Sequence, residues 1–228
     1  RAFALSLTHV QSDFHHLGIS ADDAVLFERL ASRVLGTDGS LRAPASVLAA
    51  NELGQPGLWP HSISGDLPIL LVKVSGADDA ALVRQALQAQ EYWRLKGLSA
   101  DVVIMNEHPV TYFDEMHAQL TGLLDQGPWS TWQHRPGGVY LLRADRIGRA
   151  ERVLIEAVAR AVLRGDRGEL RAQLDHPHTP GLEAERLVPA SPPRNDSPVL
   201  TPIPELALSN GLGGFTQGNR SYTIELHG

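Results

Sequence analysis

The chain has 228 residues, of which 43% are apolar, so it is long enough and apolar enough to bury a core. Its formal net charge is −6 and no block of Lys and Arg is long enough to follow a phosphate backbone, which argues against a nucleic-acid partner. The absence of cysteine excludes disulfides and thiolate zinc sites, and the longest apolar run, residues 67–72, is too short to span a bilayer.

The N-terminal part of the chain predicts one strand followed by helices. Apolar and polar side chains alternate over residues 3–9, which is typical of a β-strand. Because an isolated strand must pair with a sheet, we expect residues 1–17 to be the final strand or strands of an upstream β-domain. Residues 18–56 are predicted to be a helical connector, with Ser20 as the N-cap of its first helix and Gly36 at its end.

The central part, residues 57–175, alternates strand and helix patterns and predicts a small α/β domain. Strands are expected at residues 68–74, 101–106 and 138–142. The helices between and after them are expected at residues 78–96, at residues 112–124, and in a third segment that carries Val153, Leu154, Ala157, Val158, Ala161 and Val162 on one face. Short apolar strands with right-handed crossovers predict a three-stranded parallel sheet flanked by helices.

The C-terminal part predicts a linker and the beginning of another domain. Residues 176–204 contain eight prolines, which favours an extended, semi-rigid linker. Strand-like patterns then follow at residues 206–208 and 221–226. We therefore expect residues 205–228 to begin a downstream β-domain, and the chain to be an excerpt of a larger polypeptide.

A first candidate ligand site is the loop that enters the first predicted strand. It combines Trp59, His61, Ser64 and Asp66 with glycines and prolines. An aromatic face with hydroxyl-binding polar groups is typical of a sugar contact. The alternative is structural, because prolines stiffen such a loop and Ser or Asp side chains bond their own backbone. A Ser-His-Asp nucleophilic site is disfavoured, because the serine does not lie on a strand-to-helix turn.

A second candidate site lies where the predicted strands end. Asn106, Glu107 and Arg143 follow or close two strands, and ligands of parallel sheets bind beyond the carboxyl ends of strands. The alternative is that Asp78 and Asp145 cap the following helices and that Glu107 is solvated. Because the Trp59 loop enters a strand, we expect it at the opposite edge of the sheet.

Metal and cofactor sites are not predicted. The histidine pairs at residues 15–16 and at residues 176 and 178 lack the spacing of metal ligands. Gly211–Gly214 does not follow a strand and open a helix, so it is not a dinucleotide-binding loop, and no phosphate-binding Gly-Lys-Ser/Thr loop occurs. We expect no metal, no cofactor and no catalytic residue in this chain.

Six segments taken in order resemble one family. They are residues 1–5, 30–35, 53–69, 91–97, 102–107 and 210–215. Together they resemble the cyclic β-1,2-glucan synthases of bacteria, whose C-terminal half is related to cellobiose-type glycoside phosphorylases. The resemblance covers nearly the whole chain.

The resemblance implies a location and a set of partners. Proteins of this family are large inner-membrane enzymes with a glycosyltransferase part that uses UDP-glucose and a cytoplasmic phosphorylase-like part with β-supersandwich domains and a helical toroid. The chain would lie between two β-supersandwich regions, on the cytoplasmic face, and the family's catalytic and phosphate-binding residues would lie outside it. Two hypotheses follow: a non-catalytic docking segment that packs on those flanking domains, or a small-ligand domain that contacts β-glucan or a sugar nucleotide.

Overall fold

The structure is a computed structural model that describes residues 15, 17–36, 38–109, 115–176, 205–218 and 220–224. The chain divides into two compact units, residues 1–184 and residues 185–228. Each unit is described by itself below. The predicted strand at residues 3–9 and most of the predicted linker lie outside the described residues.

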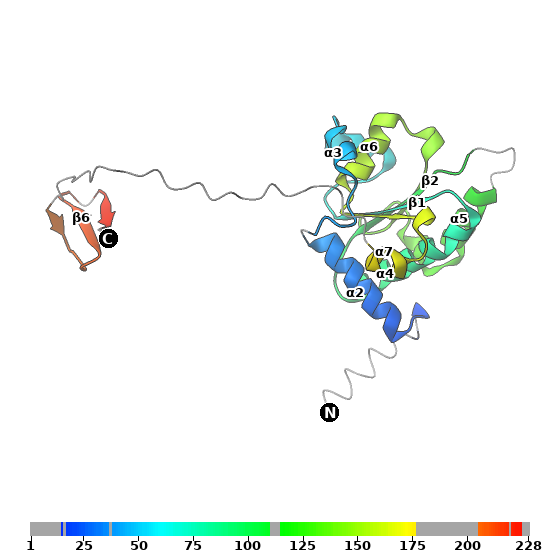
Figure 1. Ribbon diagram of the computed structural model, residues 1–228, viewed down its shortest axis with the longest axis horizontal. Coiled ribbons are helices and arrows are strands. Elements are labelled where there is room, and N and C mark those ends of the chain that lie inside the picture. The colour runs from blue at the N-terminus through cyan, green and yellow to red at the C-terminus, as the bar shows by residue number, and fades with distance from the viewer. Residues whose placement is uncertain are drawn as a thin grey trace, which may run out of the picture. The chain divides into compact units, whose positions relative to one another are not determined.

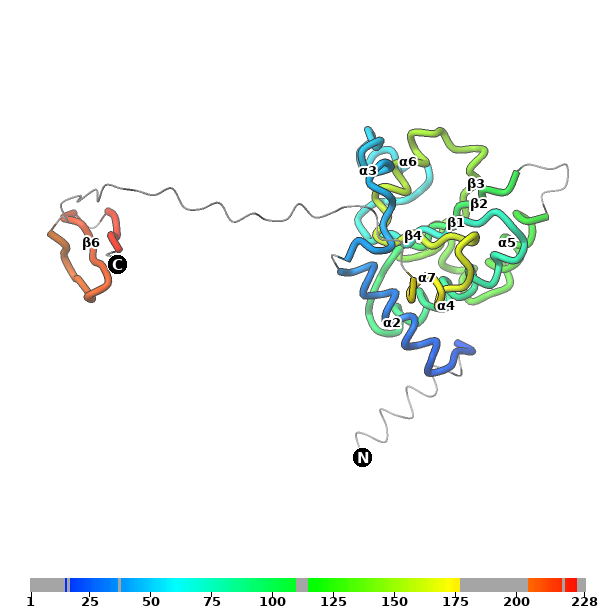
Figure 2. Tube along the Cα trace, in the orientation of Figure 1, coloured from blue at the N-terminus to red at the C-terminus, as the bar shows by residue number. Residues whose placement is uncertain are grey.

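The first unit is built on a four-stranded parallel sheet in the order β3-β2-β1-β4 (Figure 2). The strands are β1 (Ile69–Val74), β2 (Asp101–Asn106), β3 (Val139–Arg143) and β4 (Ala161–Arg164). The α-helices are α2 (Ala21–Leu35), α3 (Ala45–Ala49), α4 (Ala80–Leu95), α5 (Glu115–Gln126), α6 (Arg149–Val158) and α7 (Leu170–Asp175). Short 3-10 helices are η1 (Gln55–His61), η2 (Ala77–Asp79), η3 (Pro128–Trp132), η4 (Ala144–Arg146) and η5 (Gly165–Arg167).

Helices cover the sheet on both faces, which makes three layers (Figure 1). The helices α2, α4, α5 and α7 lie on one face, over the side chains of Leu70, Val72, Val102, Ile104 and Leu163. The helix α6, with α3 and η1, covers the other face, over Ile69, Leu71, Val103, Tyr140 and Val162. Because successive side chains of a strand point to opposite faces, every strand contributes to both cores.

Local sequence signals set several of these elements as predicted. The helix α2 begins at a capping box, in which the Asp23 backbone N–H donates to Ser20 Oγ at 3.1 Å and the Ser20 N–H donates to the Asp23 carboxylate at 2.9 Å. It ends at Gly36, and Gly97 follows α4 with a φ of +82°, a conformation that glycine adopts without strain. The strand at residues 101–106 is also confirmed.

The number of strands in the sheet was predicted wrongly. The third predicted helix was extended through Ala161 and Val162, but α6 ends at Val158, and residues 161–164 form β4. This strand pairs in parallel with β1, and Leu70 lies opposite Ala161. The apolar residues of α6 and β4 follow each other without a Gly or Pro between them, so one helical pattern fits both. The fold is α/β as predicted, but the parallel sheet has four strands.

The second unit contains a three-stranded antiparallel sheet in the order β5-β6-β7. Its strands are β5 (Leu206–Ala207), β6 (Gly213–Thr216) and β7 (Tyr222–Ile224). The first and last strands confirm the predicted β-character of this region, and β6 was not predicted as a strand. Most apolar side chains of this small sheet face solvent: Leu208 is 80% exposed, Leu212 68% and Ile224 67%.

Candidate ligand pocket at the carboxyl end of the sheet

The strand order creates a reversal between β1 and β4. The chain adds β2 and β3 on one side of β1, and α6 then carries it across to β4 on the other side. Open parallel sheets bind ligands beyond the carboxyl ends of their strands at such a reversal, because the flanking helices diverge there to opposite faces. A ligand is therefore expected to bind beside the carboxyl-terminal half of β1.

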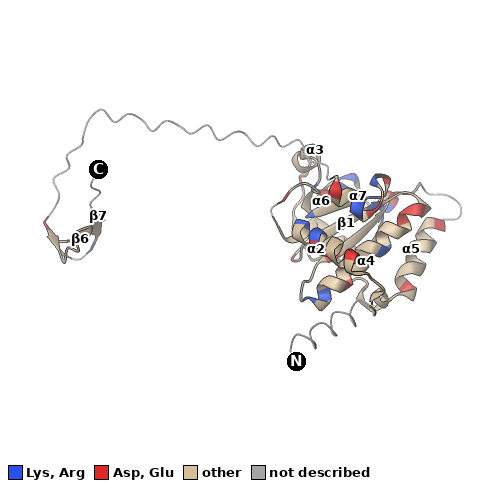
Figure 3. Ribbon diagram, turned by 60° about the horizontal axis from the view of Figure 1, so that its bottom comes forward, with Lys and Arg blue, Asp and Glu red and all other residues tan. Residues whose placement is uncertain are grey.

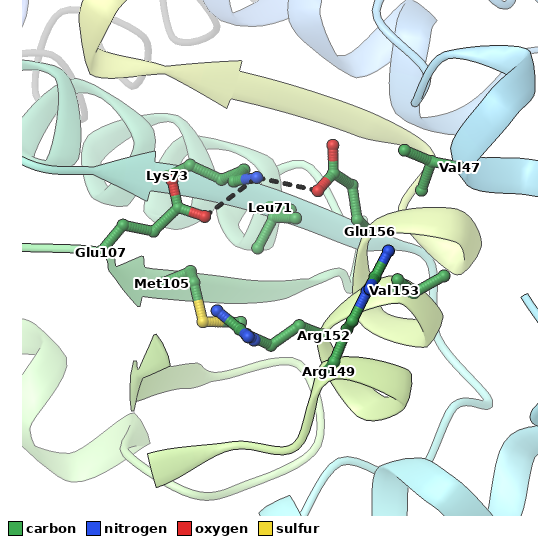
Figure 4. A pocket seen from close by; sticks show the side chains of 9 residues that line it. All are labelled: Val47, Leu71, Lys73, Met105, Glu107, Arg149, Arg152, Val153 and Glu156. Atoms are coloured by element: carbon green, nitrogen blue, oxygen red, sulfur yellow. Dashed lines mark hydrogen bonds and ion pairs between the residues drawn. The ribbon is translucent and has the colours of Figure 1, made fainter. Parts of the chain in front are cut away.

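A pocket of about 170 Å³ lies on the α6 face of this region (Figure 4). Its apolar surface comes from Leu71 and Met105 on the sheet and from Val47 and Val153 on helices. Its charged residues are Lys73 on β1, Glu107 directly after β2, and Arg149, Arg152 and Glu156 on α6. The pocket therefore has an apolar floor and charged groups of both signs.

Lys73 is the centre of the charge arrangement in the pocket. Its Nζ lies 2.8 Å from Glu156 Oε2 and 3.0 Å from Glu107 Oε1, so one ammonium group joins the helix to the loop after β2 (Figure 4). The Lys73 side chain is only 13% exposed. Because removing one partner of a shielded ion pair leaves an uncompensated charge, this arrangement holds all three side chains in place.

The first turn after β1 is filled by the protein's own carboxylate. Asp79 Oδ2 accepts hydrogen bonds from the backbone N–H groups of Ser75 at 2.8 Å and Gly76 at 2.9 Å. Backbone N–H groups of a turn before a helix are a common binding site for phosphate groups. A Cβ on Gly165, after β4, would overlap the same carboxylate, so Asp79 also closes the gap between the two strand ends. This turn is therefore not open to a phosphate group.

The second predicted site is divided between the two faces of the sheet. Asn106 and Arg143 are register partners on β2 and β3, whereas Glu107 turns to the α6 face and pairs with Lys73. Asn106 is buried and its Oδ1 accepts from the His108 backbone N–H at 2.9 Å. Arg143 binds the Asp145 carboxylate through two 3.1 Å hydrogen bonds.

Part of the structural alternative for this edge is corrected. Asp79, and not the predicted Asp78, binds the backbone before α4, and Asp145 binds Arg143 instead of capping a helix. The hydrogen bond from Arg143, opposed by slight burial, lowers the pKa of Asp145 below its usual value.

The Trp59 loop leads into the amino end of β1, and its helix η1 packs against α6. Trp59 is 60% exposed on η1. His61 Nε2 lies 3.5 Å from Glu151 Oε2 on α6, while Ser64 Oγ accepts from the Asp66 backbone N–H at 3.2 Å. The loop thus brings Ser64 and Asp66 together through local turn chemistry, and His61 turns to a different partner.

A buried carboxyl group that the sequence did not single out lies at the amino end of β2. Asp101 is fully buried, and its Oδ1 accepts from the Gly137 backbone N–H at 2.7 Å. Burial raises the pKa of Asp101 to about 6, opposed by that hydrogen bond. Burial also raises the pKa of Tyr140 to about 12, with a contribution from Asp101. In the sequence, only the position of Asp101 at the start of a predicted strand could have pointed to this buried carboxyl group.

A second cavity, of about 280 Å³, lies in the other helical layer. It is lined by Leu17, Gln88, Glu91, Pro128 and Trp129. Its polar groups are already paired within the protein: Gln88 Nε2 donates to Leu17 O at 3.2 Å, Glu91 pairs with Arg94 at 2.8 Å, and Trp129 Nε1 donates to Leu87 O at 3.2 Å. This cavity therefore offers few free polar groups to a ligand.

Charged residues of both signs are interspersed in the first unit (Figure 3). Along the described ribbon around α6 and α7, Lys and Arg alternate with Asp and Glu (Figure 3). Over the described ranges, no three His, Asp or Glu side chains gather as a metal site would require. No helix in that part of the chain is both long and apolar enough to cross a bilayer.

Comparison with known proteins agrees with the resemblance seen in the sequence. The chain is 28% identical over 241 aligned residues to the cyclic beta-(1,2)-glucan synthase NdvB of Rhizobium meliloti (strain 1021). The alignment covers 97% of this chain but only 8% of that protein. The chain is thus a distant homologue of one small region of a glucan synthase. No family model matches the chain.

Proposed function

We propose that the chain is a non-catalytic docking segment of a large bacterial cyclic β-1,2-glucan synthase, an inner-membrane glycosyltransferase that acts on UDP-glucose and β-glucan. The chain would lie between two β-supersandwich domains of that synthase, on the cytoplasmic side. These two domains would be its partners. The alignment with a region that makes up 8% of a synthase supports this assignment.

The observation that carries the docking role is the exposed apolar surface of the small second sheet. Leu208, Leu212 and Ile224 each expose about two thirds or more of their surface, and the buried residues of the described strands are Gly213 and Gly214. A three-stranded sheet needs an apolar face packed against another element to be stable. Exposed apolar surface of this kind marks a protein contact, so the sheet would be completed by a neighbouring domain.

An exchange experiment tests the docking role. The aligned region of the Rhizobium meliloti synthase is deleted, or replaced by this chain, and cyclic glucan formed from UDP-glucose is measured in membranes. We expect deletion to abolish glucan formation, this chain to restore part of it, and Leu212→Ser with Ile224→Ser to remove the restored part. Restoration that is insensitive to these two changes would contradict docking through the second sheet. The matched control is Leu35→Ser with Leu95→Ser, at two exposed leucines of the first unit.

The alternative is a ligand-binding α/β domain that contacts glucan, and the exposure of Trp59 favours it. Trp59 is 60% exposed, and an exposed indole is suited to stacking on a sugar ring. Calorimetric titration of the chain with β-1,2-glucan and UDP-glucose separates the two roles. Saturable heat that is lost on Trp59→Ala would support the alternative, whereas a docking segment gives no saturable heat with either ligand.

A further inference from the structure

The pocket beside Lys73 also contains the guanidinium groups of Arg149 and Arg152. Arg149 and Arg152 project from one face of α6 and both line the pocket (Figure 4). Among the described residues, neither side chain makes a hydrogen bond or ion pair. In contrast, Arg143 and Arg164, at the ends of β3 and β4, each bind a nearby carboxylate through two hydrogen bonds. Arg149 and Arg152 are therefore available for an anion from outside.

The opposite side of the pocket offers acceptors that are held in fixed positions. Glu107 and Glu156 share the Lys73 ammonium group at 3.0 and 2.8 Å. Each carboxylate has a second oxygen and further lone pairs that can accept from hydroxyl groups. Three cations against two carboxylates leave the pocket with a net positive charge. Such a pocket suits a ligand that combines an anionic group with hydroxyl groups.

The size and floor of the pocket restrict the ligand further. A volume of about 170 Å³ lies below the range of about 300–1,000 Å³ that drug-sized ligands occupy, so a nucleotide sugar or an oligosaccharide does not fit inside. Leu71 and Met105 provide an apolar floor on which the C–H face of a sugar ring can rest. A single sugar ring with one anionic group matches both the size and the chemistry.

We propose that this pocket binds a monosaccharide phosphate, with the phosphoryl group held by Arg149 and Arg152 and the sugar hydroxyls by Glu107 and Glu156. Paired guanidinium groups suit a phosphate because their N–H groups match its oxygen atoms. The pocket lies beside β1, the strand at which the sheet order reverses, where ligands of parallel sheets bind. The turn after β1 does not compete for the phosphate, because the Asp79 carboxylate already accepts from the backbone N–H groups of Ser75 and Gly76. The phosphate would therefore bind on the α6 side.

The test is an NMR titration of the full 228-residue chain with glucose 1-phosphate, glucose 6-phosphate, inorganic phosphate and glucose. We expect saturable shifts of β1 and α6 amides with a hexose phosphate, and weaker binding of inorganic phosphate and of glucose. Arg149→Gln with Arg152→Gln should weaken hexose phosphate binding by about tenfold or more, because two charged hydrogen-bond donors are lost. Glu107→Gln should weaken the hexose phosphates but should not weaken inorganic phosphate, because the change removes a hydroxyl acceptor and a negative charge that pairs with Lys73.

The control pair is Arg84→Gln with Arg171→Gln, which changes the net charge equally on exposed positions of the opposite helical layer. Binding that falls equally in both pairs would reflect net charge alone and would overturn the proposal. Inorganic phosphate that binds as tightly as the hexose phosphates would overturn the assignment of a sugar ligand. No saturable shift with any of the four probes would overturn the site itself, without bearing on the docking role.

Discussion

The Asp101 carboxylate and the backbone of Gly137 are joined by a 2.7 Å hydrogen bond that ties the start of β2 to the turn before β3. Gly137 has a φ of +72°, a conformation in which a side chain would be strained. Gln90 on α4 reinforces the same turn, because its Nε2 donates to the carbonyl groups of Gly137 and Gly138. Two buried polar side chains thus hold the backbone at the amino edge of the sheet.

We predict that Asp101 makes stability depend on pH in the acidic range. Its pKa is raised from the usual 3.8 to about 6, so the folded state binds its proton more tightly than the unfolded state. The contribution is fully present below about pH 4 and is lost as the pH rises through about 6. The contribution is on the order of a few kcal/mol.

Urea unfolding at pH 4, 5, 6 and 7.5 measures this effect. Asp101→Asn should be more stable than the parent chain at pH 7.5 and should not gain at pH 4. The exposed Asp78→Asn serves as the control and should shift the unfolding free energy equally at each pH. An advantage of Asp101→Asn that does not grow with pH would contradict the raised pKa.

We predict that Asp79→Ala lowers the free energy of unfolding by about 1–3 kcal/mol, because it leaves the N–H groups of Ser75 and Gly76 without their acceptor. Asp78→Ala, one residue earlier and exposed, should cost less than about 0.5 kcal/mol. Chemical denaturation of both variants provides the comparison. Equal effects of the two substitutions would show that helix-end charge, and not the turn, is responsible.

The shared ammonium group of Lys73 gives a second stability prediction. Lys73→Met removes the ammonium group that Glu107 and Glu156 share, and we expect a loss of about 1–3 kcal/mol at pH 7, below the cost of a fully buried pair because both carboxylates keep some solvent contact.

The triple change Lys73→Met, Glu107→Gln and Glu156→Gln should recover most of that stability, since neither carboxylate charge then remains without the ammonium group that it paired with. Thermal unfolding followed by circular dichroism compares these variants with the exposed control Lys96→Met. A triple variant no more stable than Lys73→Met would mean that packing of the lysine stem, and not its charge, explains the loss.

Gln90 is expected to be the most sensitive polar residue of α4. Its Nε2 donates to three carbonyl groups, those of Ala100 at 2.9 Å, Gly137 at 3.1 Å and Gly138 at 2.7 Å. Gln90→Leu keeps a similar volume but removes the donor, so we expect a loss of about 2–3 kcal/mol. The exposed Gln119→Leu on α5 should be nearly neutral. Hydrogen exchange of the Gly138 and Val139 amides should report local opening only in Gln90→Leu.

Short-range signals in the sequence determined most of the helices and strands. The capping box at Ser20, the stop at Gly36 and the apolar runs of β1 and β2 are decided by neighbouring residues, so they could be read along the chain. The sequence also located the exposed Trp59 and the polar residues where β2 and β3 end. That this loop contacts a sugar through Trp59, His61, Ser64 and Asp66 stays a prediction.

Only the tertiary structure decided where β4 lies and which side chains meet. Ala161–Arg164 fits a helical pattern as well as a strand, and its pairing with β1 is a contact between segments that are far apart in the chain. Lys73 meets Glu156, 83 residues later, because the side-chain period of two turns Lys73 to the face that α6 covers. Neighbouring residues decide local preferences for helix, strand and turn, and these can be read from the sequence. Pairing across a sheet joins distant segments, and it is decided by how the core packs.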